Sequence, residues 1–321
     1  MKKVLICGAG GFIGSHLAKR LSKEGNFVIG ADLKYPDFSN SHCDDFYITD
    51  LRDPAQVSKI FSEDIDEVYQ LAADMGGADY IFTGLKDADI TSNSILINVN
   101  ILKEMVKHKV SSVFYASSAC VYAEDNQLDS SNPICTEESA YPACPDSEYG
   151  WEKLFSERLY MNYAKNYDLR VRIARFHNVF GPEGTWQGGK EKAPAALCRK
   201  IIMSNGTPID VYGTGNQTRS FLYIDEAIEG IVKIMNSDYS KPLNLGSERL
   251  ISINDLARLI ASINLGREVE INNISGPSGV AGRVSDNNLL RKSTNWSPAE
   301  NLEEGLEKTY EWISKQVSKI S

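Results

Sequence analysis

The sequence predicts an α/β fold with a doubly wound parallel sheet, and two features of the chain carry this prediction. The apolar runs in its first half are short and continuous rather than alternating, which is typical of strands that helices cover on both faces. The segments between these runs are long enough for right-handed crossover connections. A mostly parallel sheet between two layers of helices accounts for both features.

Seven apolar runs are the expected strands. In chain order they are Val4–Cys7, Phe27–Ala31, Phe46–Ile48, Val68–Ala72, Val113–Ala116, Val171–Ala174 and Pro242–Gly246. After the first run, Ile13, Leu17 and Leu21 recur every fourth residue, and this spacing predicts a helix that ends before Gly25. Strand, turn and helix therefore follow one another from the start of the chain.

The pattern changes after Arg175, where a segment rich in glycine and polar residues begins. Beyond it we expect a helix at 195–203, a strand at 209–212 and helices at 253–263 and 302–317. We expect two domains. The sheet domain comprises residues 1–175 with a return segment at about 216–246, and a smaller α/β domain comprises about 176–215 and 247–321.

Composition excludes several classes of function. The chain has 321 residues, and its 34 basic and 43 acidic residues give a net charge of -9, which argues against a nucleic-acid partner. The six cysteines form no CxxC pair, so we expect neither a disulfide framework nor a metal site. No stretch approaches the roughly 20 apolar residues of a membrane span, and a cytoplasmic location is expected.

A glycine-rich loop after the first predicted strand indicates a dinucleotide site. Gly8, Gly11 and Gly14 form a GxxGxxG pattern, and Phe12 and Ile13 open the following helix. Glycines there let the backbone approach a pyrophosphate, and the amides at the helix N-terminus bind it.

Asp32 ends the second predicted strand, where a carboxylate binds the ribose 2′-hydroxyl in Rossmann-type domains. We therefore expect NAD. Lys34 nearby keeps NADP as an alternative, and a tight turn with a surface aspartate is the alternative without function.

Tyr149 and Lys153 lie four residues apart, which places both on one face of a helix. An ammonium beside a phenol favours phenolate, so Lys153 is expected to lower the pKa of Tyr149 toward the working pH. Tyr149 could then take a proton from a substrate hydroxyl, and Ser118 at the end of a strand could orient that hydroxyl. The alternative is a solvated helix face.

With these motifs, the whole chain resembles the extended short-chain dehydrogenase/reductase family of nucleotide-sugar enzymes. Its further marks stand here as Asp50-Leu51, Leu71-Ala72-Ala73, Ser117-Ser118, the segment RFHNVFGP at 175–182, and Arg219 within TRSFLYIDE. The resemblance implies that Asp50, Leu51 and Ala72 line the cofactor site, and that Asn178 and Arg219 meet the phosphates of the sugar nucleotide.

Longer stretches resemble the GDP-sugar 3,5-epimerase branch of that family. They are AADMGG at 72–77, YASSAC at 115–120, RFHN at 175–178, the GTW and EKAPAA segments within 184–196, and GRVSDNN at 282–288. Ser118 is followed by Ala119 and Cys120, whereas the 4,6-dehydratases of the family carry an acidic residue there. The resemblance places Gly77, Glu191, Lys200 and Gln217 around the sugar or nucleotide and Arg283 at the diphosphate.

The chemistry of such an epimerase assigns the remaining groups. Oxidation at C4 of a hexose acidifies the hydrogens at C3 and C5, and inversion there needs a base on one face of the ring and an acid on the other. We expect Cys120 to be the base, because a thiol with a depressed pKa can serve, and Lys192 to be the acid. The alternatives are a packing role for Cys120, a surface charge for Lys192 and a surface salt bridge for Arg283.

We thus expect an enzyme that binds NAD tightly, recycles it and epimerises a GDP-sugar at C3 and C5. The family resemblance also implies a homodimer formed through helices of the cofactor domain. A sugar-nucleotide 4-epimerase, or an enzyme for another GDP-sugar such as a heptose, is the alternative. An NAD-binding regulator without catalysis is the alternative from another class.

Overall fold

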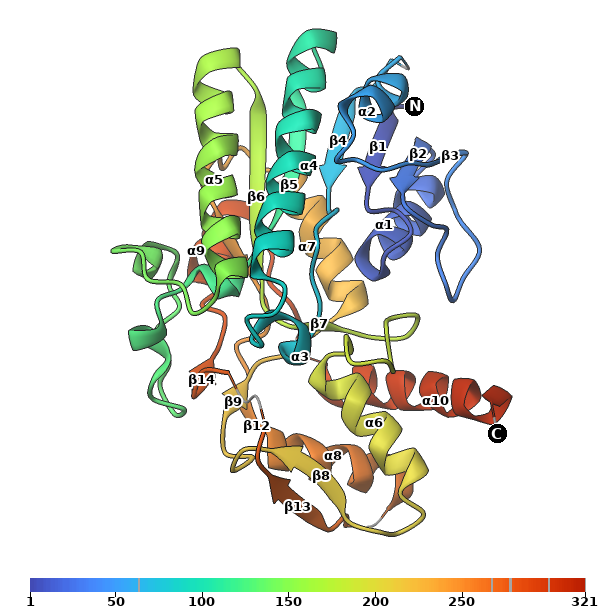
Figure 1. The fold of residues 1–321 in the computed structure, drawn as a ribbon, viewed down its shortest axis with the longest axis vertical. Coiled ribbons are helices and arrows are strands. Elements are labelled where there is room, and N and C mark those ends of the chain that lie inside the picture. The colour runs from blue at the N-terminus through green and yellow to red at the C-terminus, as the bar shows by residue number, and fades with distance from the viewer. Residues whose placement is uncertain (63, 267, 277–278, 300, 321) are drawn as a thin grey trace.

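The structure, a computed structural model, describes residues 1–62, 64–266, 268–276, 279–299 and 301–320. A parallel sheet of seven strands forms its centre, in the order β11-β6-β5-β4-β1-β2-β3 (Figure 1). The strands are β1 (Lys3–Cys7), β2 (Phe27–Asp32), β3 (Asp45–Ile48), β4 (Glu67–Gln70), β5 (Ser112–Ser118), β6 (Arg170–Phe176) and β11 (Leu243–Leu245). The predicted fold class is confirmed, and so is the return of the chain to the sheet, since β11 pairs with β6.

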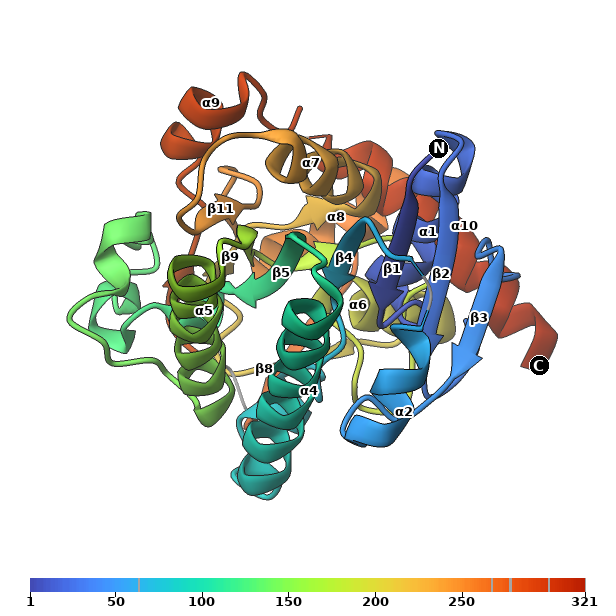
Figure 2. The same cartoon turned by 90° about the horizontal axis from the view of Figure 1, so that it is seen from above.

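Helices cover both faces of the sheet, as Figure 2 shows from above. One face packs against α2 (Pro54–Ile60), α4 (Asp87–His108) and α5 (Glu148–Tyr167). The other packs against α1 (Phe12–Lys23), α7 (Ile224–Asn236) and α9 (Asn288–Thr294). The strands are buried on both sides for this reason, which explains why their sequences are continuously apolar.

The strand expected at 68–72 ends at Gln70 rather than at Ala72. The side-chain amide of Gln70 donates to the Ala72 carbonyl at 2.9 Å and accepts from its N–H at 3.2 Å. These side-chain bonds replace the next ladder pair, so that the chain leaves the sheet and turns toward its carboxyl edge.

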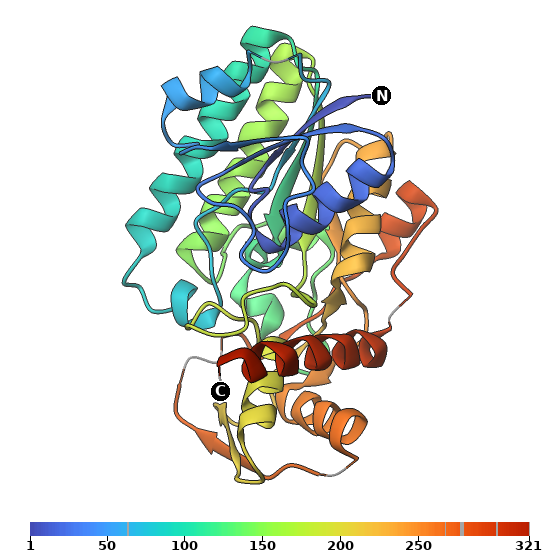
Figure 3. The same ribbon diagram turned by 90° about the vertical axis from the view of Figure 1, so that its right-hand side faces the viewer.

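A second apolar core lies below the carboxyl edge of the sheet. It is built by α6 (Ala193–Met203), β8 (Ile209–Tyr212), α8 (Ile253–Leu265) and α10 (Leu302–Ile320). Figure 3 shows α10, drawn in red, running across the molecule between the sheet and α8. The helix and strand expected at 195–203 and 209–212 are confirmed, as are the two helices expected after residue 250.

Short strands join the two parts. They are β7 (Val179–Phe180) with β10 (Leu222–Tyr223), and β9 (Thr218–Arg219) with β12 (Ile251–Ser252) and β14 (Gly282–Arg283). Within the second core, β13 (Ile271–Ile274) pairs with β8. The remaining elements are α3 (Ala78–Ile81) and the 3-10 turns η1 (Ala119–Val121), η2 (Glu124–Gln127) and η3 (Glu137–Ala140). Among the described helices, none is both long and apolar enough to cross a membrane.

Candidate active site

The predicted site residues gather at the carboxyl edge of the sheet, where β1, β4 and β5 end. Gly8 follows β1 with a φ of 89°, a conformation that suits glycine. A Cβ on Gly8 would lie 2.8 Å from the Ala72 backbone N, so the loops after β1 and β4 are in direct contact. In open parallel sheets, ligands bind at this edge.

The glycine loop is shaped for close approach of a phosphate group. A Cβ on Gly14 would lie 2.0 Å from the Gly8 carbonyl oxygen, and only glycine lets the loop pass this close to the helix. α1 begins at Phe12 and Ile13 after Gly11, and no side chain caps its first amides. The amides at this end of the helix can therefore donate to an anion.

Asp32 lies beside this loop at the end of β2. Its carboxylate accepts from the backbone N–H of Gly10 at 3.0 Å and of Leu33 at 2.6 Å. Burial raises the pKa of Asp32, and these amide bonds oppose the shift. The carboxylate is thus held against the glycine-rich loop at the end of β2.

Asp50 and Leu51 follow β3 and are held by partners that the sequence analysis did not single out. The Arg52 guanidinium lies 2.7 Å from the Asp50 carboxylate and holds the pKa of that carboxyl below its usual range. Leu51 is buried, and its carbonyl accepts from Asn100 of α4 at 3.1 Å. The buried Leu51 thus lies next to the Asp50 carboxylate, which Arg52 holds in place.

Tyr149 and Lys153 lie in the first turns of α5. Ser147 caps this helix by accepting from the Gly150 N–H at 3.2 Å. Lys153 Nζ donates to the Ala116 carbonyl of β5 at 3.0 Å and lies 5.6 Å from the centre of the Tyr149 ring. The predicted pair therefore faces the end of β5.

The ionisation of this pair differs from the sequence prediction. Burial raises the pKa of Tyr149 above its usual range, Cys120 and Glu152 act in the same direction, and a hydrogen bond with Ser118 opposes them. Burial likewise lowers the pKa of Lys153. Burial is the largest influence on the pKa of Tyr149, and Lys153 Nζ donates to the Ala116 carbonyl rather than to the phenol.

Cys120 lies in η1, directly after β5, and is buried beside Tyr149. Its backbone N–H donates to Ser118 Oγ at 3.2 Å. Arg283 Nη1 of β14 donates to Cys120 Sγ at 3.3 Å. Lys192, just before α6, donates from Nζ to the Gly76 carbonyl at 3.3 Å.

Burial lowers the pKa of Lys192, with the nearby Cys120 acting against the shift. The structure therefore brings the predicted base, acid and phenol together. Lys192 is no free surface charge, and Arg283 is buried rather than part of a surface salt bridge.

The predicted sugar-side residues fall into two groups. Glu191 accepts from Arg199 at 2.7 Å, and a Cβ on Gly77 would lie 2.6 Å from its carbonyl oxygen, so this contact lies next to Lys192. Further away, Lys200 Nζ donates to the Asp210 carbonyl at 2.6 Å and Gln217 Nε2 to the Tyr212 carbonyl at 2.9 Å. Both of these acceptors belong to β8.

Asn178 and Arg219 lie between these groups. Asn178 follows β6 with a φ of 43° and donates to the Ser220 carbonyl at 3.0 Å. Arg219 of β9 is paired in register with Arg283 of β14. Burial, with the neighbouring Arg283 charge, lowers the pKa of Arg219 to about 10. Two cations side by side at the edge of the site suit a doubly charged anion.

Several polar residues that the sequence does not mark support the site. Asp146 pairs with Arg283, and Gln127 accepts from Arg283 Nε. Asn98 of α4 joins Gln70 to Glu152 and Ser156 of α5 through buried hydrogen bonds. No motif marks these positions, because their partners come from distant parts of the chain.

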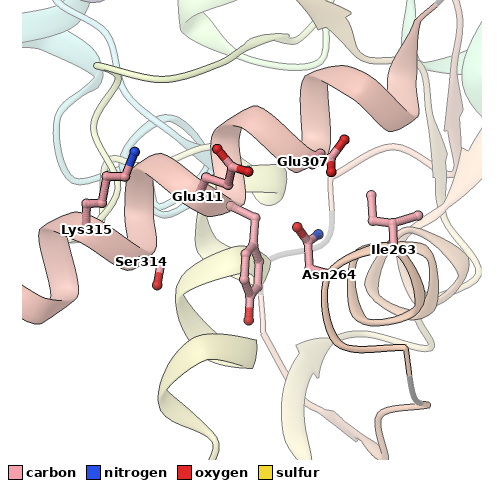
Figure 4. Close-up of a pocket in the computed structure, with 7 residues that line it drawn as sticks. Ile263, Asn264, Glu307, Glu311, Ser314 and Lys315 are labelled. Carbon is pink, nitrogen blue, oxygen red and sulfur yellow. The ribbon is translucent and has the colours of Figure 1, made fainter.

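A separate shallow pocket lies between α8 and α10 and is lined by Ile263, Asn264, Glu307, Tyr310, Glu311, Ser314 and Lys315 (Figure 4). None of the predicted site residues borders it. Among the described residues, no group of three or more His, Cys, Asp or Glu side chains is placed to hold a metal ion.

Comparison with known proteins fits this geometry. The sequence model of the NAD dependent epimerase/dehydratase family matches residues 4–246. The chain belongs to this family. It is 43% identical to GDP-mannose 3,5-epimerase of Arabidopsis thaliana over 99% of this chain and 83% of that protein. GDP-mannose 3,5-epimerase 1 of Oryza sativa subsp. japonica shows the same identity and coverage.

Solved structures agree in fold. UDP-glucuronic acid 4-epimerase from Bacillus cereus, in complex with UDP-glucuronic acid and NAD, superposes with a TM-score of 0.81 at 26% identity, covering 98% of this chain and 99% of that one. UDP-glucose 4-epimerase from Thermotoga maritima gives a TM-score of 0.86 at 24% identity, covering 98% and 99%. The chain is thus an NAD-dependent epimerase, and the predicted cofactor and family resemblance are confirmed.

Proposed function

We propose that this enzyme epimerises GDP-mannose, or a close GDP-sugar, at C3 and C5 through a transient 4-ketone, giving products of the GDP-L-galactose and GDP-L-gulose type. One observation carries the proposal. Cys120 and Tyr149 pack together, and Lys192, from a separate segment, lies close enough to Cys120 for their charges to interact. The identity to the plant GDP-mannose 3,5-epimerases supports the choice of substrate.

The first step removes the C4 hydrogen and the proton of its hydroxyl. Ser118 orients the hydroxyl and Tyr149 accepts its proton. Bound NAD would supply the acceptor for the C4 hydride and, later in the cycle, its donor. Burial raises the pKa of Tyr149 and so favours its neutral phenol. The Lys153 ammonium, 5.6 Å from the centre of the Tyr149 ring, opposes this effect because a nearby cation favours the phenolate.

Inversion follows from the two groups that flank the ring. Cys120 takes the proton from C5 or C3, which the C4 ketone has made acidic, and Lys192 delivers a proton to the opposite face. Burial lowers the pKa of Lys192, so its ammonium releases a proton more readily than an exposed lysine does. Re-reduction of C4 returns the proton from Tyr149, and no net oxidation occurs.

The remaining contacts are assigned by position. Asn178, Arg219 and Arg283 bind the diphosphate, Gly77 and Glu191 border the sugar, and Lys200 and Gln217 lie on the side of the guanosine. Gly8, Gly11 and Gly14 hold the NAD pyrophosphate, while Asp32 binds the ribose. Because the same NAD is oxidised and reduced in each cycle, it stays tightly bound.

The proposal is tested by incubating the enzyme with GDP-mannose in D2O and analysing the recovered sugar by NMR and mass spectrometry. Deuterium at C3 and C5 together with new epimers is the expected result. Cys120→Ser should retain NAD but lose deuterium incorporation. Cys144→Ser, which alters an exposed cysteine, should keep both. Full activity of Cys120→Ser, with inversion at C4 alone, would favour a 4-epimerase. Bound NAD without turnover of any nucleotide sugar would favour a regulator.

We further propose a homodimer in which α4 and α5 pack against their counterparts. These helices lie side by side on one face of the sheet (Figure 2). Leu96 of α4 is 48% exposed, and Trp151 and Phe155 of α5 are 44% and 51% exposed. Large apolar side chains exposed on neighbouring helices favour a contact with another protein surface.

We also propose a cytoplasmic location, because all six cysteines are free thiols. The two apolar regions, around the sheet and around α6, α8 and α10, support the proposed division into a cofactor domain and a sugar-nucleotide domain.

A further inference from the structure

Arg283 is held in one geometry by three protein groups. Its Nε donates to Gln127 Oε1 at 2.5 Å, its Nη1 to Cys120 Sγ at 3.3 Å, and its Nη2 to the Asp146 carboxylate. A guanidinium presents its donors in a rigid planar fork. Fixing two of its nitrogens on Gln127 and Asp146 therefore fixes the direction in which Nη1 points.

The partners of Arg283 are themselves fixed. Gln127 is completely buried, and its amide donates to the carbonyls of Tyr122 and Ala123, both at 3.1 Å. Asp146 keeps only 3% of its side chain exposed, and its other carboxylate oxygen accepts from Ser147, the cap of α5. The carboxylate is thus tied to the helix that carries Tyr149.

The position of Arg283 affects the reactivity of Cys120 because several charged groups surround the thiol. The groups that face it are Arg283 and Arg219 from the paired strands β14 and β9, Lys192 before α6, and Tyr149 and Lys153 of α5. Of these cations, Arg283 pairs with the Asp146 carboxylate. Although burial disfavours a charged Arg283, the neighbouring Cys120 and Asp146 hold its pKa above the usual range.

We propose that Asp146 is a positioning residue that sets the reactivity of Cys120 through Arg283. Asp146 aims the guanidinium so that Nη1 touches Sγ, and its negative charge offsets part of the cationic charge that stabilises a thiolate. Cys120 therefore remains reactive, but less so than the neighbouring cations alone would make it. The role deepens the proposed function, because it concerns the proposed base, and it concerns the free enzyme before any sugar binds.

The test measures Cys120 directly, without a nucleotide sugar. Alkylation by iodoacetamide at neutral pH is followed at the Cys120 peptide by mass spectrometry, in the NAD-bound enzyme and in a Cys144→Ser background that removes an exposed thiol. Asp146→Asn removes the carboxylate charge with little change in shape. It should raise the alkylation rate about tenfold, since the guanidinium charge then acts on Sγ without compensation.

Two further variants separate charge from structure. Asp146→Glu keeps the charge and should react at nearly the wild-type rate. Arg283→Lys keeps a cation but loses the fork, so Cys120 should react more slowly than in the wild type. Thermal unfolding and retained NAD confirm that each variant is folded, and Arg283→Lys carries the test where Asp146→Asn does not fold.

The proposal is overturned if Cys120 is alkylated at the same rate in all variants, or in none of them. It is also overturned if Cys120 reacts more slowly in Asp146→Asn than in the wild type. Because no sugar is present, these outcomes do not depend on whether GDP-mannose is the substrate. If the alkylation rates follow the expected order but GDP-mannose recovered from D2O carries no deuterium, the proposed function alone is refuted.

Discussion

Replacing Arg175 by Met should remove about 3–5 kcal/mol of the free energy of unfolding, because it leaves a buried carboxylate without its cation. Arg175 of β6 is 2% exposed, and its partner Glu157 of α5 is completely buried. The guanidinium donates to both carboxylate oxygens, at 2.8 and 2.7 Å. It also donates to the Glu137 carbonyl at 2.8 Å. The free energy of unfolding of a typical protein is only about 5–15 kcal/mol, so this loss should be a large fraction of it.

The chain contains a matched control on its surface. Arg249 donates to Glu303 through two bonds of 2.7 Å each, but the two side chains are 38% and 47% exposed. Arg249→Met should therefore cost about 0–1 kcal/mol, because water solvates Glu303 once the arginine is gone. The two substitutions are chemically identical and differ in burial.

Urea unfolding followed by both fluorescence and circular dichroism measures these costs, and coincident transitions establish that one free energy describes each variant. The double variant Arg175→Met/Glu157→Leu should recover most of the loss, since no unpaired charge then remains. A loss of stability in Arg175→Met no larger than that in Arg249→Met would contradict this expectation. A double variant less stable than Arg175→Met would contradict it as well.

Three further outcomes are expected. Gly14→Ala should abolish retention of NAD on purification, read from the absorbance of the isolated protein, because its Cβ would lie 2.0 Å from the Gly8 carbonyl oxygen. Turnover should fall as pH rises through the lowered pKa of Lys192, whose protonated form is the proposed acid, and Lys192→Arg should move this decline in the pH–rate profile to higher pH if it retains activity. Trp151→Glu with Phe155→Glu should convert the proposed dimer to a monomer in analytical ultracentrifugation, since charges cannot be buried in an apolar contact.

The strands and the cofactor loop could be predicted because their signals are local. The run Val4–Cys7 is continuously apolar, and Gly8 to Gly14 follow it directly, so neighbouring residues carry the whole pattern. The predicted strand boundaries miss by one or two residues, as at Gln70, where a side chain replaced the ladder. Local patterns determine an element but not its last residue.

The support of the site could not be predicted in the same way. Asp146 is a single acidic residue before a helix, and its partner Arg283 is 137 positions away. The pKa of Tyr149 depends on burial by segments that meet only in the folded chain, so the spacing to Lys153 alone suggested the wrong direction. Spacing along a helix reports which residues are neighbours, whereas desolvation depends on the whole fold.

The subunit contact proposed for α5 has a consequence for the enzyme at low concentration. The same turn of this helix carries the buried phenol of Tyr149 and the exposed indole of Trp151, on opposite sides. A helix behaves as a nearly rigid rod over so short a distance, so a subunit contact on its outer side would also hold the phenol in place. Specific activity should then depend on dilution, and association of subunits would act as a control on turnover.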